Sequence, residues 1–371
     1  MKSLQMQSCV HDEGTIECAL FDIDVPAPSA KEVMVKIEAS PINPSDLGLM
    51  FGAADIDSIR ASERNGHPSI ILDVPPPVMR AMATRINEWL PVGNEACGTV
   101  VEAGASPEAQ ALLGKRVALF GGEMYSNYRT ISVFQCIPLA DDTTPEEGAS
   151  CFVNPMTALG FVETMKMEGH KAIVHTAAAS NLGQMLNRIC LNDGVPLVNV
   201  VRNEEQVALL KGQGAEHVVN SSDDDFADQL AAAVNATGAT IAFDAIGGGK
   251  LGNAILMAME AGAVKRMTEW SRYGSNEYKQ LYIYGALDLA PTTLNRGYGF
   301  SWGIGGWLLT PFMMKAGGEV VRQMQAKVVA ELTTTFASHY SDRVSLAESM
   351  TPQIGSRYGV RRTGQKTLIT F

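Results

Sequence analysis

Residues 171–183, KAIVHTAAASNLG, lead from a short apolar run through a loop of small residues into an amphipathic segment. The run 171–176 has the length of a buried strand, and residues 182–191 carry apolar side chains at helical spacing. In such a strand-loop-helix unit, small residues let a dinucleotide pyrophosphate approach the main chain at the helix N-terminus. The loop holds one glycine where the common fingerprint has three, so a plain small-residue turn remains an alternative.

The sequence on either side of this stretch predicts two kinds of domain. After Pro155, strands alternate with helices, which is typical of a parallel sheet. We expect its strands at 195–201, 217–220, 240–245 and 280–284, and helices at 204–212, 224–235 and 251–260. Before it, short runs between Gly and Pro residues predict a β-rich domain, with strands at 31–40, 98–102, 116–120 and 128–133. Beyond Asn295 the chain is Gly-rich and irregular, with a helix expected at 319–332 and a last strand at 366–371.

Residues 53–91 differ in sequence pattern from the rest of the β-rich part. Three prolines, 75–77, precede a segment, 78–90, that has the pattern of one amphipathic helix. We interpret 53–91 as a surface insertion.

Composition limits the classes of function. A chain of 371 residues favours two domains, and its formal charge of −11 disfavours nucleic acid and anionic lipid as partners. The six cysteines have no short-spaced pair, so we expect reduced thiols in a cytoplasmic protein. Residues 1–14 lack the apolar core of a signal peptide, and no apolar run is long enough for a membrane span.

Arg202 follows the second expected strand, 22 residues after Ser180. At this place NAD enzymes usually have an acidic residue for the ribose hydroxyl, whereas an Arg accommodates the 2′-phosphate of NADP. Arg202 therefore points to NADPH. The alternative is a solvated residue balanced by Glu204 and Glu205.

The strand at 240–245 ends in the Gly-rich loop 243–248, FDAIGG. Ligands of open parallel sheets bind at the carboxyl ends of the strands, so Ile246 and Gly247 are candidate cofactor residues. A tight strand-to-helix turn explains the same residues.

Six motifs together resemble the zinc-free medium-chain dehydrogenase/reductases, and most closely their quinone oxidoreductase and 2-enoyl thioester reductase branch. They are, in chain order, INPSD at 42–46, GNEACG at 93–98, GKRV at 114–117, NPMTA at 154–158, the loop 177–183 and FDAIG at 243–247. The resemblance implies an α/β protein with a GroES-like β-rich catalytic domain and a Rossmann domain with a doubly wound parallel sheet. We expect the first domain at 1–153 and 295–371, and the second at 154–294.

The resemblance also implies a function: NADPH-dependent reduction of quinones or α,β-unsaturated carbonyls. Asn43, Thr157 and Tyr125 are the candidate catalytic residues. The residues implied to bind the cofactor are Asn154, Ala178, Ser180, Asn181, Leu182, Gly183, Arg202, Ile246, Gly247, Tyr284 and Gly285. Two alternatives stay open, a 2-enoyl thioester reductase and a nucleotide-binding sensor or interaction protein without turnover.

Three features depart from the wider family. Zinc-using relatives keep ligands where this chain has Asn43, Ser45 and Asn94, which are poor zinc ligands, so we expect no metal. Thioester reductases usually have a Tyr shortly after the first motif, and here the chain reads MFGAA at 50–54. Ser180 replaces a family glycine, and its Cβ would crowd a pyrophosphate, although its hydroxyl could donate to a phosphate oxygen.

The remaining candidates have structural alternatives. His175 ends an apolar strand, and we interpret it as a core histidine. Trp302, Trp307 and Phe312 could line a substrate cleft or pack in the core. The run 280–284, QLYIY, would suit a sheet edge that is buried in a homodimer, but it could also be an inner strand.

Overall fold

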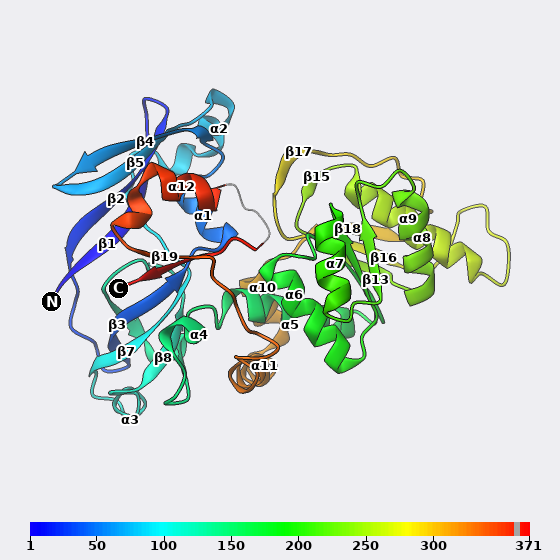
Figure 1. Cartoon of the computed structure of the whole chain (residues 1–371). Coiled ribbons are helices and arrows are strands. Elements are labelled where there is room, and N and C mark those ends of the chain that lie inside the picture. Colours follow the sequence, from blue (N-terminus) through cyan, green and yellow to red (C-terminus); the bar gives the residue numbers. More distant parts are fainter. Residues whose placement is uncertain (360–363) are drawn as a thin grey trace. The chain divides into compact units, whose positions relative to one another are not determined.

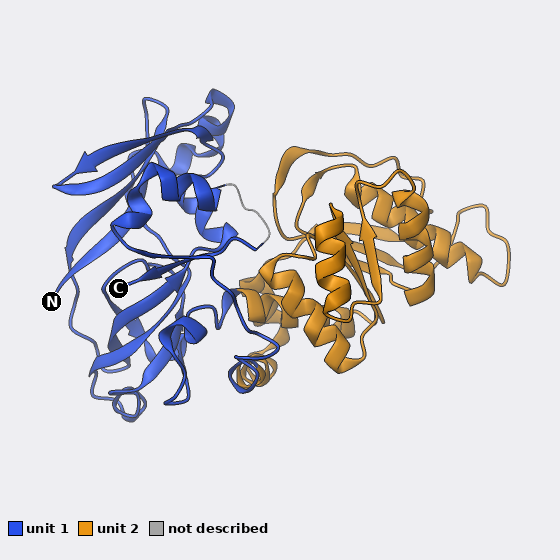
Figure 2. Cartoon of the chain, viewed as in Figure 1, with its two compact units in different colours: residues 1–153, 328–371 blue, residues 154–327 orange. Residues whose placement is uncertain are grey.

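The computed structural model describes residues 1–359 and 364–371 and divides the chain into two compact units (Figure 1, Figure 2). Unit 1 comprises Met1–Val153 and Val328–Phe371, and unit 2 comprises Asn154–Lys327. The β-rich part was expected to resume at 295, but residues 295–327 lie in unit 2. The reason is that strand β18 (Trp302–Gly306) pairs with β16 (Lys279–Ile283) of the parallel sheet. Within the described residues, no helix has the length and apolar character needed to cross a membrane.

Unit 1 contains two sheets. The first has the strand order β4-β5-β2-β1-β6 and is antiparallel. The second has the order β10-β8-β7-β3-β20-β19, and β9 also pairs with β3. The strands are β1 (Lys2–His11), β2 (Thr15–Asp24), β3 (Glu32–Pro41), β4 (Asp55–Arg64), β5 (His67–Asp73), β6 (Leu90–Pro91), β7 (Glu95–Ala103), β8 (Arg116–Phe120), β9 (Tyr128–Ser132), β10 (Cys136–Pro138), β19 (Asp342–Ser345) and β20 (Thr367–Thr370).

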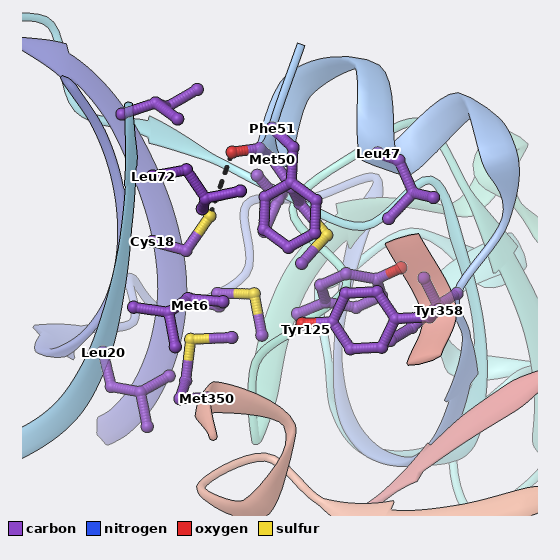
Figure 3. Packing of buried hydrophobic residues seen from close by; sticks show 14 of the residues in the cluster. Met6, Cys18, Leu20, Leu47, Met50, Phe51, Leu72, Tyr125, Met350 and Tyr358 are labelled. Atoms are coloured by element: carbon purple, nitrogen blue, oxygen red, sulfur yellow. Dashed lines mark hydrogen bonds between the residues drawn. The ribbon is translucent and has the colours of Figure 1, made fainter. Parts of the chain in front are cut away.

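Short helices close the sheets of unit 1 around an apolar core. Figure 3 shows part of this core, where Met6, Leu20 and Met350 pack near Phe51 and Tyr358, whose rings stack at 5.7 Å. The helices are α1 (Pro44–Met50), α2 (Pro76–Ala81), α3 (Pro107–Gln110), α4 (Pro145–Ala149) and α12 (Pro352–Gly359), with 3-10 turns at Ala83–Arg85, Val133–Gln135 and Glu348–Met350.

The insertion 53–91 adds the β4-β5 hairpin to the edge of the first sheet. The single helix expected at 78–90 is wrong. Helix α2 ends at Ala81, and Asn87 has a φ of +61°, a left-handed conformation that a helix interior does not allow. The chain instead pairs with β1, because the N–H of Asn87 donates to the carbonyl of Val10. Tertiary pairing here overrides the local helical pattern.

Unit 2 is a six-stranded parallel sheet with the order β13-β12-β11-β14-β16-β18. This is the order of a doubly wound dinucleotide-binding sheet, which confirms the expected fold class. The strands are β11 (Ile173–Thr176), β12 (Leu197–Val201), β13 (His217–Asn220), β14 (Ile241–Asp244), β16 and β18, with a small parallel pair β15 (Gly247–Gly249) and β17 (Asp288–Thr292). The helices are α5 (Val153–Met167), α6 (Asn181–Asp193), α7 (Glu204–Gly212), α8 (Phe226–Thr237), α9 (Leu251–Lys265), α10 (Leu309–Ala316) and α11 (Gly318–Ala330).

A buried ion pair ties α9 to β16. The Nζ atom of Lys279, whose side chain is 0% exposed, lies 2.7 Å from Oε2 of Glu260 and donates to the carbonyl of Glu277. The other carboxylate oxygen of Glu260 accepts the N–H of Ser275 at 2.8 Å. One carboxylate therefore holds both the start of β16 and the loop that leads into it.

The aromatic residues of the Gly-rich segment belong mainly to the core of unit 2. Trp307 is 9% exposed, and its Nε1 donates to Oγ1 of Thr164 at 3.0 Å. Phe312 is 6% exposed and stacks on Trp307, while Trp302 packs edge-on against Tyr298. Of the two interpretations offered for these rings, the structure favours core packing.

Candidate functional site

The loop after β11 brings helix α6 against the main chain. Ala177 adopts a φ of +50°, and Ser180 is the N-cap of α6, with its Oγ accepting the N–H of Gly183 at 3.1 Å. A Cβ added at Gly183 would lie 2.2 Å from the carbonyl oxygen of Ala178. The positive end of the helix dipole therefore lies directly at the loop.

Ser180 has a role that we did not expect. Its hydroxyl oxygen is an acceptor in the helix cap, whereas the sequence suggested a crowding Cβ or a donor to phosphate. A serine in this position satisfies one of the N–H groups that a helix start leaves without a partner. The seryl side chain thus supports the loop geometry.

The loops after the neighbouring strands β14 and β16 lie against each other. A Cβ added at Gly247, which has a φ of +79°, would lie 2.8 Å from the carbonyl oxygen of Gly285. A Cβ at Gly285 would lie 2.6 Å from the carbonyl oxygen of Ala245. The structure therefore brings together Ile246, Gly247, Tyr284 and Gly285, four of the predicted cofactor residues, at the carboxyl edge of the sheet.

Asp244 and Thr176 fix this edge, and sequence reasoning missed their role. Oδ1 of Asp244 accepts Oγ1 of Thr176 at 2.7 Å and the N–H of Ile246 at 2.9 Å, and Oδ2 accepts the N–H of Gly247 at 3.1 Å. Thr176 also accepts the N–H of Ala245 at 2.8 Å. Both residues end adjacent parallel strands, and that shared position is the signal that could have identified them.

Arg202 stands directly after β12 and is exposed. Its main-chain N–H donates to Gln206 and its carbonyl accepts from Ser222, so the backbone is fixed. Glu204, expected as a counter-charge in the alternative interpretation, instead accepts a hydrogen bond from Asn220. Over residues 1–359 and 364–371, the guanidinium of Arg202 makes no ion pair within 4.0 Å.

In unit 1, the residues at the zinc-ligand positions bond with one another and with two buried carboxylates. Nδ2 of Asn43 donates to Oε1 of Glu95 at 2.8 Å, and Nδ2 of Asn94 donates to Oγ of Ser45 at 3.0 Å. The carboxylate of Asp46 accepts the main-chain N–H groups of Asn43 and Asn94, each at 2.8 Å. Within the described part of the chain, no group of three or more His, Cys, Asp or Glu residues is arranged to hold a metal ion.

Burial shifts the titration of this polar cluster. It raises the pKa of the Asp46 carboxyl to about 7 and raises the pKa of Glu95, because charged carboxylates lose hydration. It also lowers the pKa of Lys366 to about 8. The positive charge of Lys366 opposes this rise in the pKa of Glu95, but burial has the larger effect.

Tyr125, which was predicted as a catalytic residue, lies in the core of unit 1. The side chain is 0% exposed in the core of Figure 3, and its hydroxyl donates to the carbonyl of Pro41 at 3.0 Å. A substrate could reach this oxygen only if the core of unit 1 opened.

Asn154 and Thr157 lie in the first turn of α5, where they are 8% and 7% exposed. Their spacing of three residues places them on one side of the helix. They belong to unit 2, as do all the predicted cofactor residues, whereas Asn43 belongs to unit 1.

His175 lies in the core of unit 2, as interpreted from the sequence. It is 0% exposed, its Nε2 shares a 2.8 Å hydrogen bond with the hydroxyl of Tyr284, and Phe161 packs nearby. Burial lowers the pKa of the imidazole to about 3. Because the hydroxyl of Tyr284 bonds to His175, this side chain faces the core. Any contact of Tyr284 with a ligand beside Gly247 would therefore be made by its main chain.

Comparison with known proteins agrees with this geometry. Residues 181–265, which begin at α6, match the family of zinc-binding dehydrogenases. A solved structure assigned as an NADPH:quinone reductase from Mesorhizobium loti is 27% identical, with a TM-score of 0.73 over 100% of this chain and 98% of that one. The chain is thus similar to zinc-binding dehydrogenases over residues 181–265 and to this reductase structure over its whole length.

Other similar proteins are named for enoyl thioesters. The complex of Etr1p with NADP and crotonyl-CoA is 18% identical, with a TM-score of 0.70 over 100% of both chains, and at that identity it shows the fold alone. The mitochondrial enoyl-[acyl-carrier-protein] reductase of Xenopus tropicalis is 24% identical over 216 residues, 56% of this chain and 53% of that enzyme. The chain thus spans about half the length of this curated relative.

Proposed function

We propose that this chain is an NADPH-dependent oxidoreductase that reduces quinones or α,β-unsaturated carbonyls without zinc. One observation carries the proposal. The close contact between α6 and the loop 177–183 is combined with an Arg202 guanidinium that, among residues 1–359 and 364–371, makes no ion pair at the end of the next strand. That pair of features suits a pyrophosphate and a 2′-phosphate.

The residues of unit 2 fit NADPH. Cβ atoms at Gly183, Gly247 or Gly285 would collide with main-chain oxygens, so the loops are built for close main-chain contact. We assign the pyrophosphate to 178–183, the 2′-phosphate to Arg202, and the nicotinamide side to Asn154, Ile246, Gly247, the main chain at Tyr284 and Gly285, and Thr157. When bound, the cofactor supplies a hydride from its nicotinamide ring.

The protein groups then have binding and electrostatic tasks. Asp244 holds the loop at Ile246 and Gly247 in one conformation, so the ligand meets a preorganised edge. Asn43, fixed by Glu95, is the candidate in unit 1 that stabilises negative charge on the acceptor oxygen, and Thr157 is a candidate nicotinamide or substrate neighbour in unit 2. The oxyanion that hydride transfer leaves on the acceptor then takes its proton from water, so neither side chain needs to supply one.

A second candidate is reduction of 2-enoyl thioesters, favoured by the relatives that act on such substrates. Against it stands the missing Tyr: Met50 and Phe51 occupy that region and are 0% and 5% exposed. A third candidate is a nucleotide-binding sensor without turnover.

NADPH oxidation with a panel of quinones, enones and enoyl thioesters separates the three candidates. We expect rates above background with the first two groups. Turnover with enoyl thioesters alone would favour the second candidate, and no acceptor-dependent rate with any group would favour the third.

Arg202→Ala should weaken NADPH binding about 10- to 100-fold and leave NADH binding unchanged. The lost contact is a charge-assisted hydrogen bond to phosphate, worth about 1.5–3 kcal/mol. Fluorescence titration of both cofactors against both proteins measures this. Lys211→Ala, which removes a cation from the adjacent helix α7, is the control and should change neither affinity. Equal wild-type affinities for the two cofactors would contradict the assignment.

We also propose a homodimer in the cytoplasm. Of the two interpretations of 280–284, the inner strand is the one found, because β16 has β14 on one side and β18 on the other. This strand therefore cannot be the sheet edge that a second copy covers. The edge strand is β18, WGIGG, which carries none of the charges or prolines that protect an open edge, so a second copy is a suitable cover. The cytoplasmic assignment is supported by six cysteines, all free and buried.

Ile304→Lys should convert the dimer into a monomer, because it places a charge on the open edge strand. Ile304 is 39% exposed. Leu209→Lys is a matched control, since Leu209 is 38% exposed on α7, a helix beside β13 at the opposite edge. Light scattering at micromolar concentration gives the mass. A monomeric wild type, or a dimer that survives Ile304→Lys with the fold intact, would exclude this interface.

A further inference from the structure

Glu95 is a buried carboxylate in unit 1, and both of its oxygens accept hydrogen bonds. It is 1% exposed at the start of β7. Oε1 accepts Nδ2 of Asn43 at 2.8 Å, and Oε2 accepts the main-chain N–H groups of Phe152 at 2.9 Å and Val153 at 2.8 Å. Each oxygen therefore serves a different part of the chain.

The two parts are Asn43 and the chain that enters α5. Asn43 is the proposed oxyanion residue of unit 1. Val153 is the last residue of the first segment of unit 1, and the next residue, Asn154, begins unit 2 and is followed by Thr157 on the same helix. Phe152 is held a second way, by stacking on Phe120 at 3.8 Å.

The neighbours of Glu95 favour its charged form, although burial leaves its pKa raised. Lys366, 9% exposed, contributes a favourable charge and donates from Nζ to Oγ of Ser150 at 2.7 Å. Ser150 in turn shares a 2.7 Å hydrogen bond with the hydroxyl of Tyr340. Burying a carboxylate is costly unless charge and hydrogen bonds compensate it, and here both are present.

We propose that Glu95 is a positioning residue that sets the amide of Asn43 with one oxygen and the chain entering α5 with the other. The inference rests on the proposed function for its effect on turnover. Its structural half, the restraint on 152–153 and on the Asn43 amide, does not depend on turnover.

The test uses Glu95→Gln in the full chain with Glu17→Gln as matched control. Glu17 is also a 1% exposed glutamate of unit 1, but it bonds to Arg64 and His11. Glutamine has one carbonyl oxygen, so it cannot accept from both sides of Glu95. We expect kcat to fall about 100-fold in Glu95→Gln, the loss typical of a displaced reacting group. The affinity for NADPH, which unit 2 binds, should stay within about threefold.

Two readouts do not need activity. Hydrogen exchange at the amides of Phe152 and Val153 should rise in Glu95→Gln and not in Glu17→Gln. The NMR signal of the Asn43 side-chain amide, identified by its loss in Asn43→Ala, should shift in Glu95→Gln alone. If Glu95→Gln does not fold, Glu95→Asp, which keeps the charge but shortens the side chain, takes its place with the same expectations.

A double-mutant cycle separates positioning from general stability. If Glu95 acts through Asn43, adding Glu95→Gln to Asn43→Ala should lower kcat by less than about threefold further, whereas independent effects multiply. Multiplying effects, an unchanged kcat in either single variant, or unchanged hydrogen exchange and amide signals would each overturn the proposal. A wild type without any turnover would instead refute the proposed function, and the exchange and NMR results would then decide the positioning alone.

Discussion

Gly183→Ala should destabilise unit 2 by about 1–3 kcal/mol and weaken NADPH binding at least about tenfold, because one added methyl group overpacks a closed contact. The new Cβ would lie 2.2 Å from the carbonyl oxygen of Ala178, and that oxygen belongs to the main chain, which cannot rotate away. Helix α6 must therefore shift off the loop, and the N–H groups at its start move with it.

Gly212→Ala is the matched control for this substitution. Gly212 ends helix α7, and an added Cβ meets no atom within 4 Å. Alanine is a better helix former than glycine by up to about 1 kcal/mol, so this variant should be neutral or more stable. Thermal unfolding and NADPH titration of both variants measure the contrast. A stable Gly183→Ala protein with wild-type affinity would show that the contact is not closed.

Lys279→Met should destabilise unit 2 by about 3–5 kcal/mol, since it leaves the charge of Glu260 buried without its partner. The double variant Lys279→Met/Glu260→Gln should recover more than half of the loss. It has no buried charge, and the glutamine carbonyl can still accept the N–H of Ser275.

The exposed pair Glu319–Arg322 provides the control for Lys279→Met. Its side chains are 69% and 70% exposed, and such pairs contribute about 0–1 kcal/mol. Arg322→Met should therefore move the unfolding midpoint little. Because the chain has two units, the transition of unit 2 is followed separately. A Lys279→Met protein as stable as the wild type would contradict the prediction that the buried charge of Glu260 needs Lys279 as its partner.

The parallel sheet was the most predictable part of the fold. Buried strands read as short apolar runs, and the expected strands at 195–201 and 217–220 contain β12 and β13. Helix α7 was expected at 204–212 and is found there, with Asn203 as its cap. Local composition and tertiary structure agree in these segments, so the pattern of apolar residues was sufficient to predict them.

Segments whose structure depends on distant partners were less predictable. β18, WGIGG, has too few side chains to resemble a strand, and it becomes one because β16 offers a free edge. Its glycines fit close neighbours, since a Cβ at Gly303 would lie 2.2 Å from the hydroxyl oxygen of Tyr278. The helical pattern at 78–90 failed for the opposite reason, because pairing with β1 outweighed a local preference.

The candidate site shows the same division. Gly183 and Gly247 could be selected from motifs, and the close main-chain contacts explain why glycine is needed there. Glu95 gave no local signal of its role, because it acts on residues that lie elsewhere in the chain, and Asp244 gave only its position at the end of a parallel strand. Whether Asn43 and Thr157 take part in the reaction remains a prediction for the experiments above.

The place of β20 in the second sheet has a consequence for biosynthesis. This strand, Thr367–Thr370, lies between β3 and β19 and pairs with residues 39–41 of β3, whereas β9 pairs with residues 32–36 on the same edge. The end of β3 therefore leaves the ribosome more than 300 residues before the neighbour that covers it. At about 5–20 residues per second, that edge waits roughly 15–65 seconds while all of unit 2 is translated. Unit 1 thus completes its second sheet only after residues 367–370 have been made, and until then the end of β3 is an open β-edge of the kind that can pair with another chain.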